Sequence, residues 1–280
     1  MAVVDWTTSR GRFIVAESDD MGSISRIKIE AAAASDRGVE RSINQDVVYQ
    51  WVSEQDLNPP RALLMVADGM GGHQEGEVAS RLAVETINNI LLPELRKKRI
   101  DKNKITEIIR TAVNESNASI FDYAIENDII PQDMGTTLDC VVLVGIEAYL
   151  AHVGDGRVYI LDRDGLRQIT SDHSAVAEMV GVGLLDPEEI YTHPKRNILT
   201  QGLGGDSKLE VIVEKFDVSI GERILVCSDG LWGLVRDPAI EKILLWASPP
   251  HVLVKELIAA ANEAGGEDNI SIIICDILPA

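Results

Sequence analysis

The most informative segment of the chain, residues 63–73, reads Leu63-Leu64-Met65-Val66-Ala67-Asp68-Gly69-Met70-Gly71-Gly72-His73. Its apolar first half is typical of a buried strand, and a helical pattern begins soon after it. The connection between the two is too long and too rich in glycine for a hairpin turn, and glycine lets a backbone approach a ligand closely. We therefore expect Asp68 to end a buried strand beside a binding site.

Three further aspartates share this context, because each lies next to Gly or Asn at one end of an apolar run. They are Asp155, Asp229 and Asp268, of which only Asp268 precedes its run. Strands of a sheet present their ends together, so four such carboxylates can converge on one place. A lone Asp-Gly pair is more often a simple turn, as we expect at Asp164-Gly165, where strands flank the pair closely. For any one aspartate taken alone, that simpler interpretation stays open.

A cluster of carboxylates is unfavourable unless a positive charge lies within it, because like charges raise one another's pKa. A bound divalent cation removes this conflict. Oxygen ligands from aspartate, from a backbone carbonyl such as that of Gly69 and from water suit Mg²⁺ or Mn²⁺, and no Cys or His residues are paired at zinc-like spacing. The sequence therefore predicts a magnesium or manganese site.

Around these motifs the periodicities predict groups of strands separated by pairs of helices. Helical patterns cover residues 77–97, 103–126, 238–246 and 251–264. Strand patterns cover residues 27–34, 46–52, 62–67, 138–144, 148–153, 157–161, 166–170, 209–213, 223–227 and 270–277. Short connections favour antiparallel pairing, and the absence of a βαβα alternation argues against a doubly wound parallel sheet. The predicted fold class is α+β, with stacked antiparallel sheets flanked by helices.

Composition limits the classes of function. The 280 residues carry 26 Lys and Arg against 45 Asp and Glu, a net charge of −19. This balance argues against sequence-independent nucleic-acid binding, which needs cations facing phosphates. The three cysteines, Cys140, Cys227 and Cys275, each lie in an apolar run, so we expect buried core thiols and a reducing compartment.

The chain shows no internal repeat and no low-complexity linker. Residues 1–25 have no clear period, and we interpret them as an N-terminal extension of uncertain order before one domain over residues 26–280. Charged residues interrupt any apolar stretch in the first thirty positions, and no apolar run approaches the ~20 residues that cross a bilayer. We therefore expect a cytoplasmic protein.

A further motif, Arg41-Ser42-Ile43-Asn44-Gln45-Asp46, lies near the start of the domain. The guanidinium of Arg41 can grip a phosphate through its fork of donors. Taken alone this signal is weak, because a surface Arg near an Asp is more often a solvated pair.

The motifs gain specificity from their order along the chain. That order is residues 41–46, Asp68-Gly69-Met70-Gly71-Gly72-His73, Gly135-Thr136-Thr137, residues 151–157, Ser228-Asp229-Gly230 and Asp268-Asn269-Ile270. Together they resemble the bacterial branch of the type 2C, or PPM, metal-dependent Ser/Thr protein phosphatases. The resemblance extends from about residue 27 to residue 277.

The resemblance implies a four-layer αββα sandwich with a binuclear metal centre at one end. By position, Asp68 resembles the carboxylate that bridges both metals, with the Gly69 carbonyl on the second. Asp229 and Asp268 match further ligands of the first metal, and Asp155 matches a residue that joins Asp229 at a third, weaker site. The cofactors implied are two or three Mn²⁺ or Mg²⁺ ions.

The resemblance also implies the reaction. A water bridging two cations ~4 Å apart attacks the phosphorus of phosphoserine or phosphothreonine in proteins, without a phosphoenzyme. Arg41 corresponds to the phosphate-binding arginine, and His73 resembles the histidine proposed to protonate the leaving group; a solvent-exposed loop histidine without that role is the alternative. The partners implied are phosphorylated proteins made by a Ser/Thr kinase, and we expect a monomer.

Two positions depart from the family pattern. Animal relatives have Glu-Asp where this chain has Gln45-Asp46, which leaves Asp46 to act at the second metal through water. Gly156 stands where family members usually have Ser, which changes local hydrogen bonding near the third site. Residues 171–205 resemble the flap beside the family's active site, and we expect them to form part of the protein-substrate surface.

Two other classes of function compete with this interpretation. A regulatory or binding module that keeps the fold without activity is disfavoured, since such a module has no need for clustered Asp68, Asp229 and Asp268. A nucleotide-binding protein that uses residues 69–72 as a phosphate loop is disfavoured because no Lys-Ser/Thr follows the glycines.

Overall fold

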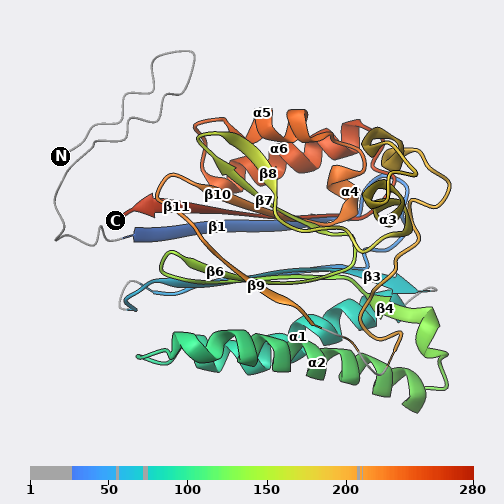
Figure 1. The fold of residues 1–280 in the computed structure, drawn as a ribbon, viewed down its shortest axis with the longest axis horizontal. Helices are drawn as coiled ribbons and strands as arrows, with labels where there is room; N and C mark the ends of the chain where they lie inside the picture. The colour runs from blue at the N-terminus through green and yellow to red at the C-terminus, as the bar shows by residue number, and fades with distance from the viewer. Residues whose placement is uncertain (1–26, 55–56, 72–74, 207–208, 210) are drawn as a thin grey trace.

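The computed structural model describes residues 27–54, 57–71, 75–206, 209 and 211–280. Two β-sheets are stacked face to face, and each carries helices on its outer side, so the molecule has four layers (Figure 1). All strand pairs within the sheets are antiparallel, so the predicted α+β sandwich is confirmed. No helix in the described part of the chain is both long and apolar enough to cross a membrane.

One sheet has five strands in the order β1-β11-β10-β7-β8. They are β1 (Ile27–Asp36), β7 (Arg157–Asp162), β8 (Gly165–Gln168), β10 (Arg223–Cys227) and β11 (Ile270–Pro279). The first and last strands of the domain pair along their full length, from Ile27 opposite Pro279 to Asp36 opposite Ile270. The sheet therefore ties the start of the domain to its end.

The other sheet follows the order β2-β3-β5-β6-β9, with β4 paired to the end of β3. Its strands are β2 (Asp46–Val52), β3 (Arg61–Gly71), β4 (Met134–Thr136), β5 (Leu138–Val144), β6 (Glu147–Val153) and β9 (Val213–Asp217). β3 lies inside this sheet, between β2 and β5, and both of its faces are covered.

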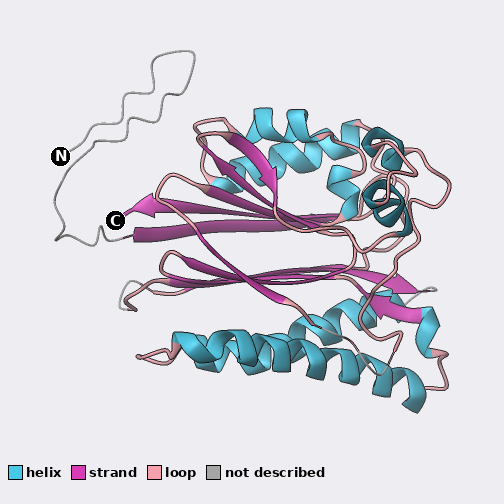
Figure 2. Cartoon of the chain, in the orientation of Figure 1, coloured by secondary structure: helices cyan, strands magenta, loops and turns pink. Residues whose placement is uncertain are grey.

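Helices cover the outer face of each sheet (Figure 2). The long helices α1 (Glu75–Leu95) and α2 (Lys102–Glu126) lie on the six-stranded sheet. The helices α4 (Asp229–Trp232), α5 (Asp237–Leu244) and α6 (Pro250–Glu263) lie on the five-stranded sheet. The flap region contains α3 (Ala175–Gly181) and the 3₁₀ helix η2 (Pro187–Tyr191), and a second 3₁₀ helix, η1 (Pro131–Asp133), precedes β4.

Three apolar clusters fill the spaces between the four layers. On β3, Leu63 and Met65 point toward α1 and α2, while Leu64 and Val66 point into the space between the sheets. Successive side chains of a strand face opposite sides, so a strand buried on both sides reads as a continuous apolar run. This explains why polar and apolar residues do not alternate along residues 63–67.

The structure differs from the predicted elements in three places. The predicted strand at residues 209–213 is wrong, because residues 209, 211 and 212 lie outside any strand and β9 begins only at Val213. The apolar side chains of Leu209 and Val211 pack into the core under α2 without strand pairing, whereas β9 is an edge strand with exposed charged residues. β3 continues past Asp68 to Gly71, and Asp229 opens the short helix α4.

The three cysteines are buried free thiols, as predicted. Burial raises the pKa of Cys140 to about 12 and raises the pKa of Cys227 well above its ordinary value. These thiols are therefore neutral core groups at physiological pH.

Candidate metal centre

Strand register brings distant acidic residues to one end of the sandwich. The end of β10 lies beside the starts of β7 and β11. Cys227, the last residue of β10, pairs with Arg157 of β7 on one side and with Ile272 of β11 on the other. The turns at this edge carry Asp155, Asp229 and Asp268. In the facing sheet, Asp46 lies directly opposite Asp68 on the neighbouring strand. Figure 1 shows this end on the right, with β3 and β4 in the lower sheet and α4 on the upper one.

Asp68 is held in place through its backbone. Its amide donates to Thr137 Oγ1 at 3.0 Å, and its carbonyl accepts from Thr136 Oγ1 at 2.8 Å and from the Thr137 amide at 2.9 Å. These bonds leave the carboxylate unengaged by the threonines. The Gly-Thr-Thr motif therefore fixes the backbone of Asp68 and leaves its carboxylate without hydrogen bonds to these threonines.

The aspartates raise one another's pKa. Burial, followed by the negative charges of Asp46, Asp229, Asp155 and Asp268, raises the pKa of Asp68 well above its ordinary value. Burial and the charges of Asp268 and Asp46 likewise raise the pKa of Asp229 to about 7. The carboxylates thus lie within electrostatic reach of one another, as a shared ion site requires.

Asp46 and Asp155 belong to the same cluster. Burial raises the pKa of Asp46 to about 6, although the Ser228 hydroxyl donates to its Oδ2 at 2.9 Å. Burial and then the charge of Asp229 raise the pKa of Asp155 well above its ordinary value. The backbone of Asp155 is fixed by Trp232, whose Nε1 donates to the Asp155 carbonyl at 2.9 Å.

The chemistry of this cluster fits a cation. Asp46 Oδ1 and Asp229 Oδ1 are buried and have no hydrogen-bond partner among the described residues. Unpaired buried carboxylate oxygens are costly, and a divalent ion with oxygen ligands satisfies them. Among the described residues, no group of three or more His, Cys, Asp or Glu side chains is arranged so that it could hold a metal ion as it stands. The structure therefore shows an acidic cluster, and ligation by it belongs to the proposal below.

Arg41 lies at the rim of the cluster. Its Nη2 is 2.6 Å from Asp268 Oδ2, and half of its side chain is exposed. Asn269 fixes the loop that carries Arg41, because its Nδ2 donates to the carbonyls of Arg37 and Ile43 and its Oδ1 accepts from the Gln45 amide. Sequence reasoning included Asn269 in a motif but gave it no role.

Gly69 lies where no side chain fits, since a Cβ there would be 2.1 Å from the Gly76 carbonyl oxygen. The glycine here allows β3 to approach the start of α1 closely, whereas the expected approach of this backbone to a ligand stays a prediction. The predicted role of the Gly69 carbonyl as a ligand stays a prediction. His73 lies outside the described residues.

Sequence reasoning missed the residues that surround Asp155. Asp139 on β5 is fully buried, and its Oδ1 is 2.8 Å from Nδ1 of His152, its neighbour on β6. Nε2 of His152 is 3.1 Å from the Ser171 carbonyl oxygen. An ionised Asp139 and a carbonyl both accept, so these two contacts, with the raised pKa of His152, favour a ring protonated at both nitrogens. The signal in the sequence was a charged residue inside the apolar run 138–144.

A second histidine stacks on the first in the opposite protonation state. The rings of His152 and His173 lie 4.7 Å apart, and the Gly154 amide donates to Nδ1 of His173 at 3.2 Å. Burial and the charge of His152 lower the pKa of His173, whereas Asp139 raises that of His152 despite its burial. His173 is therefore neutral and holds Gly154, the residue before Asp155.

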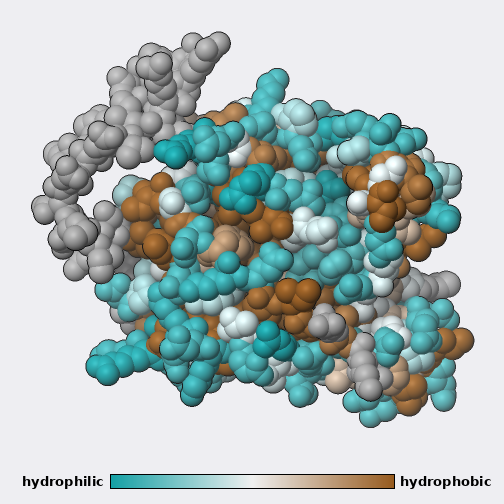
Figure 3. Space-filling view, in the orientation of Figure 1, coloured by the Kyte–Doolittle hydropathy of each residue, from teal (hydrophilic) through white to brown (hydrophobic). Residues whose placement is uncertain are grey.

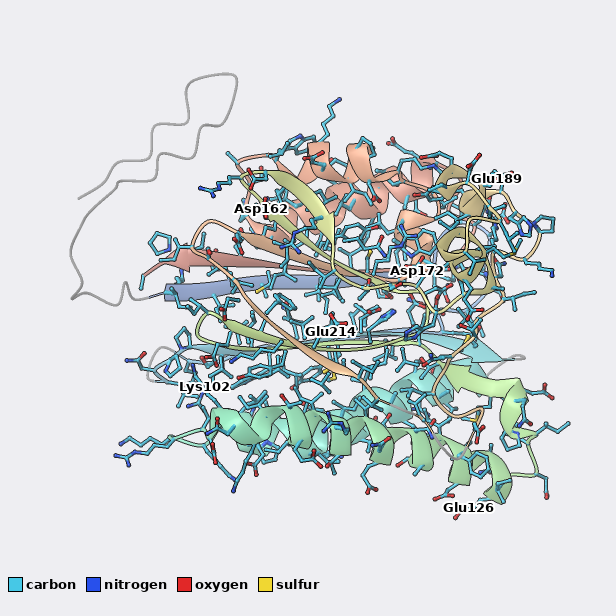
Figure 4. All side chains as sticks on the ribbon, in the orientation of Figure 1. Lys102, Glu126, Asp162, Asp172, Glu189 and Glu214 are labelled. Carbon is cyan, nitrogen blue, oxygen red and sulfur yellow. The ribbon has the colours of Figure 1, made fainter. Side chains whose placement is uncertain are left out.

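Arg157 and Asp172 complete this surround. Nη2 of Arg157 lies 2.7 Å from Asp172 Oδ2, the two side chains are 4% and 6% exposed, and the guanidinium lies 3.6 Å from the centre of the Trp232 ring. Figure 4 labels Asp172 at this end of the molecule, below α3. Because Asp172 opens the flap region, the pair ties the flap to the segment that carries Asp155.

With this geometry established, comparison with known proteins identifies the family. The profile of the family described as Protein phosphatase 2C matches residues 35–251. The chain belongs to the protein phosphatase 2C family. The serine/threonine phosphatase stp of Listeria monocytogenes is 35% identical over 251 residues, which cover 89% of this chain and 96% of the relative.

Solved structures of the protein phosphatase 2C family agree with the fold. The Mycobacterium tuberculosis serine/threonine phosphatase PstP/Ppp has a TM-score of 0.78 and 34% identity, and the match covers 90% of this chain and 99% of that one. A catalytic domain of PstP in complex with two manganese ions has a TM-score of 0.77 and 32% identity over 90% of this chain and 99% of that one. The predicted family and sandwich fold are therefore confirmed.

Proposed function

We propose that this chain hydrolyses phosphoserine and phosphothreonine in proteins at a centre of two Mn²⁺ or Mg²⁺ ions. The observation that carries the proposal is the cluster of buried aspartates with raised pKa values and unpaired oxygens. The PstP structure with two manganese ions supports the number of ions. The proposed ligands are Asp46, Asp68, the Gly69 carbonyl, Asp155, Asp229 and Asp268, with Asp155 and Asp229 at a third, weaker site.

When bound, such ions acidify a water that bridges them and neutralise phosphate charge, so that water can attack phosphorus directly. The chain's own residues prepare the site. Ser228 fixes the orientation of Asp46, and the Gly-Thr-Thr motif fixes the backbone of Asp68. Positioning of this kind matters because reacting groups must meet at a defined distance and angle.

Arg41 is the proposed phosphate-binding group. Its guanidinium already lies against the carboxylate of Asp268 at the rim of the cluster, where half of the side chain faces solvent. A phosphate that enters the cluster presents negatively charged oxygens that a guanidinium can bind through two parallel hydrogen bonds, as it can bind a carboxylate. His73 is the proposed donor of the proton that the leaving hydroxyl group of Ser or Thr needs.

The remaining parts of the proposal concern context. The catalytic unit is one domain over residues 26–280, with residues 1–25 as an N-terminal extension and residues 171–205 as the flap. Its substrates are phosphoproteins made by a Ser/Thr kinase in the cytoplasm, and it acts as a monomer. The alternative, a catalytically inactive module with the same fold, differs in having no metal-dependent turnover.

The test is hydrolysis of a phosphothreonine peptide with Mn²⁺, with chelator, and by Asp68→Asn and Asp229→Asn. We expect activity with Mn²⁺ and a loss of about 10²-fold or more in the other three cases. Asp164→Asn is the matched control, because Asp164 is 86% exposed in a hairpin turn. Mn²⁺ binding measured by calorimetry should weaken in both site variants, and unchanged binding and turnover in them would refute the assigned ligands.

A further inference from the structure

A large groove runs beside the acidic cluster. It has a volume of about 1310 Å³. Its lining includes Met70, Gly71 and Glu75, residues 199–203 of the flap region, and Ile212 and Glu214. The volume exceeds what a phosphorylated side chain alone requires, so the groove has room for a stretch of polypeptide.

The groove is continuous with the residues that hold the aspartates. Gly135, which lines it, precedes Thr136, and the Thr136 hydroxyl donates to the Asp68 carbonyl. On the opposite side, His173 lines the groove, and its amide donates to the Gly154 carbonyl at 2.7 Å, next to Asp155. A chain whose phosphorylated residue reaches the aspartates therefore passes its neighbouring residues through the groove.

The charge of the groove is mainly negative, and the one cationic side chain among its described lining residues is that of His152. Five carboxylate side chains line it, and no described lining residue is Lys or Arg. They are Glu75, Asp128, Asp133, Asp206 and Glu214. Figure 4 shows Glu214 on β9, on the face turned toward the viewer.

Most of these carboxylates have no cation beside them. Among the described residues, no ion pair includes Glu75, Asp128, Asp133 or Glu214, whereas exposed carboxylates elsewhere often form one. Glu94, for example, pairs with Lys97. Buried Oε2 of Glu75 also has no hydrogen-bond partner within the described ranges. The groove thus presents acidic groups that remain available to a ligand.

Apolar side chains line the groove together with these carboxylates. Ile130 and Ile212 are 62% and 67% exposed, and Met70, Leu199 and Leu203 also line the groove. Figure 3 shows brown apolar atoms among teal polar ones on the face that carries β9. Lys and Arg combine an aliphatic stem with a charged head, and so match a groove that is lined by both apolar and acidic groups.

From these observations we infer that the groove binds the polypeptide segment flanking the phosphorylated residue and selects segments that carry Lys or Arg. This inference rests on the proposed phosphatase activity and specifies the substrate class of the same site. Complementary charge favours a basic segment, and repulsion from the groove carboxylates disfavours an acidic one.

The experiment measures kcat/KM of the full chain for three phosphothreonine peptides that differ only in flanking residues, which are Arg, Ala or Glu. An aryl phosphate too small to reach the groove serves as the internal reference for each variant. The test variant is Asp128→Asn/Glu214→Gln; Asn suits position 128, where φ is 57°. The matched control, Glu85→Gln/Glu256→Gln, removes the same charge from exposed positions outside the groove.

We expect the Arg peptide to exceed the Glu peptide about tenfold in kcat/KM at low salt, and the test variant to reduce that ratio about threefold after normalisation to the aryl phosphate. The control variant should keep the wild-type ratio. Equal kcat/KM for all three peptides, or an equal ratio in both variants, would overturn the inference while leaving the phosphatase proposal intact. Failure to hydrolyse any peptide or the aryl phosphate would instead refute the phosphatase proposal.

Discussion

The carboxylate of Asp139 occupies the space that a side chain at position 156 would need, since a Cβ on Gly156 would lie 1.9 Å from Asp139 Oδ2. A residue larger than glycine at position 156 therefore does not fit beside the native Asp139 unless one of them shifts. The Ser that the family resemblance led us to expect at position 156 would meet this carboxylate. Gly156 makes room for a buried acid that pairs with His152.

The first prediction follows from this exclusion. Gly156→Ser should lower the free energy of unfolding by about 1–3 kcal/mol, because overpacking forces side chains or backbone to shift. In an Asp139→Ala background the same substitution should cost less than about 0.5 kcal/mol, since the obstructing carboxylate is gone. Urea unfolding of the four proteins in this cycle measures both costs, and equal costs would show that the two positions do not interact.

The second prediction concerns the metal-free protein and pH. The carboxyl pKa rises from 3.8 in the unfolded chain to about 6 for Asp46 and about 7 for Asp229. The folded state therefore binds more protons between these values, and the free energy of unfolding should fall as pH rises from about 4 to about 7. Mn²⁺ should flatten this fall, because a cation stabilises the ionised carboxylates.

Urea unfolding at pH 5 and pH 7.5, in chelator and in Mn²⁺, measures this dependence. Asp229→Asn removes one of the perturbed groups, so its metal-free stability should fall less steeply with pH than that of the wild type. The same slope in wild type and variant would mean that Asp229 titrates as it does in the unfolded chain.

The third prediction concerns Arg41. Arg41→Lys keeps the charge but loses the planar fork of donors, so kcat/KM for a phosphothreonine peptide should fall by about tenfold, and Arg41→Ala should lower it further. Both effects should appear with an aryl phosphate as well, because Arg41 is proposed to bind the phosphate itself. Arg163→Ala, at a position 76% exposed in the β7–β8 turn, is the control. Wild-type kinetics in Arg41→Ala would exclude the phosphate-binding role.

The fourth prediction concerns the buried pair of Arg157 and Asp172. Arg157→Ala leaves a carboxylate with 6% exposure without its cation, and should cost about 3–5 kcal/mol of unfolding free energy. The exposed pair of Arg163 and Asp164 provides the comparison, and Arg163→Ala should change stability by less than about 0.5 kcal/mol. Thermal and urea unfolding measure both. A small effect of Arg157→Ala would show that the pair does not hold the flap region to the β6–β7 turn.

Much of the fold could be predicted because its signals are local. The apolar run before Asp68 indicated a strand buried on both faces, and the long amphipathic patterns located α1 and α2 within a few residues. The predicted strand at residues 209–213 failed because an apolar run shows that a segment is buried, not whether it pairs. β9 escaped notice because an edge strand with one exposed face carries charged residues such as Glu214 and Lys215.

The aspartates proposed for the candidate site could be selected from the sequence, but the contacts that surround them could not. Asp68, Asp155, Asp229 and Asp268 could be chosen from sequence because each has the same local context. Asp139 carried no such context, and its importance depends on cross-strand pairing with His152 and on the missing side chain of Gly156. Cross-strand partners are fixed by register, which single-sequence patterns do not specify.

The sequence by itself determined the family and the class of fold, and it supplied the acidic residues that we propose as metal ligands, because these inferences depend on residue types in short motifs and on their order. Only the tertiary structure decided that Asp46 faces Asp68, that the pKa of His152 is raised while that of His173 is lowered, and that an acidic groove adjoins the cluster. The reason is that burial, shared protons and electrostatic repulsion depend on distances between residues far apart in the chain, which strand register and layer packing set.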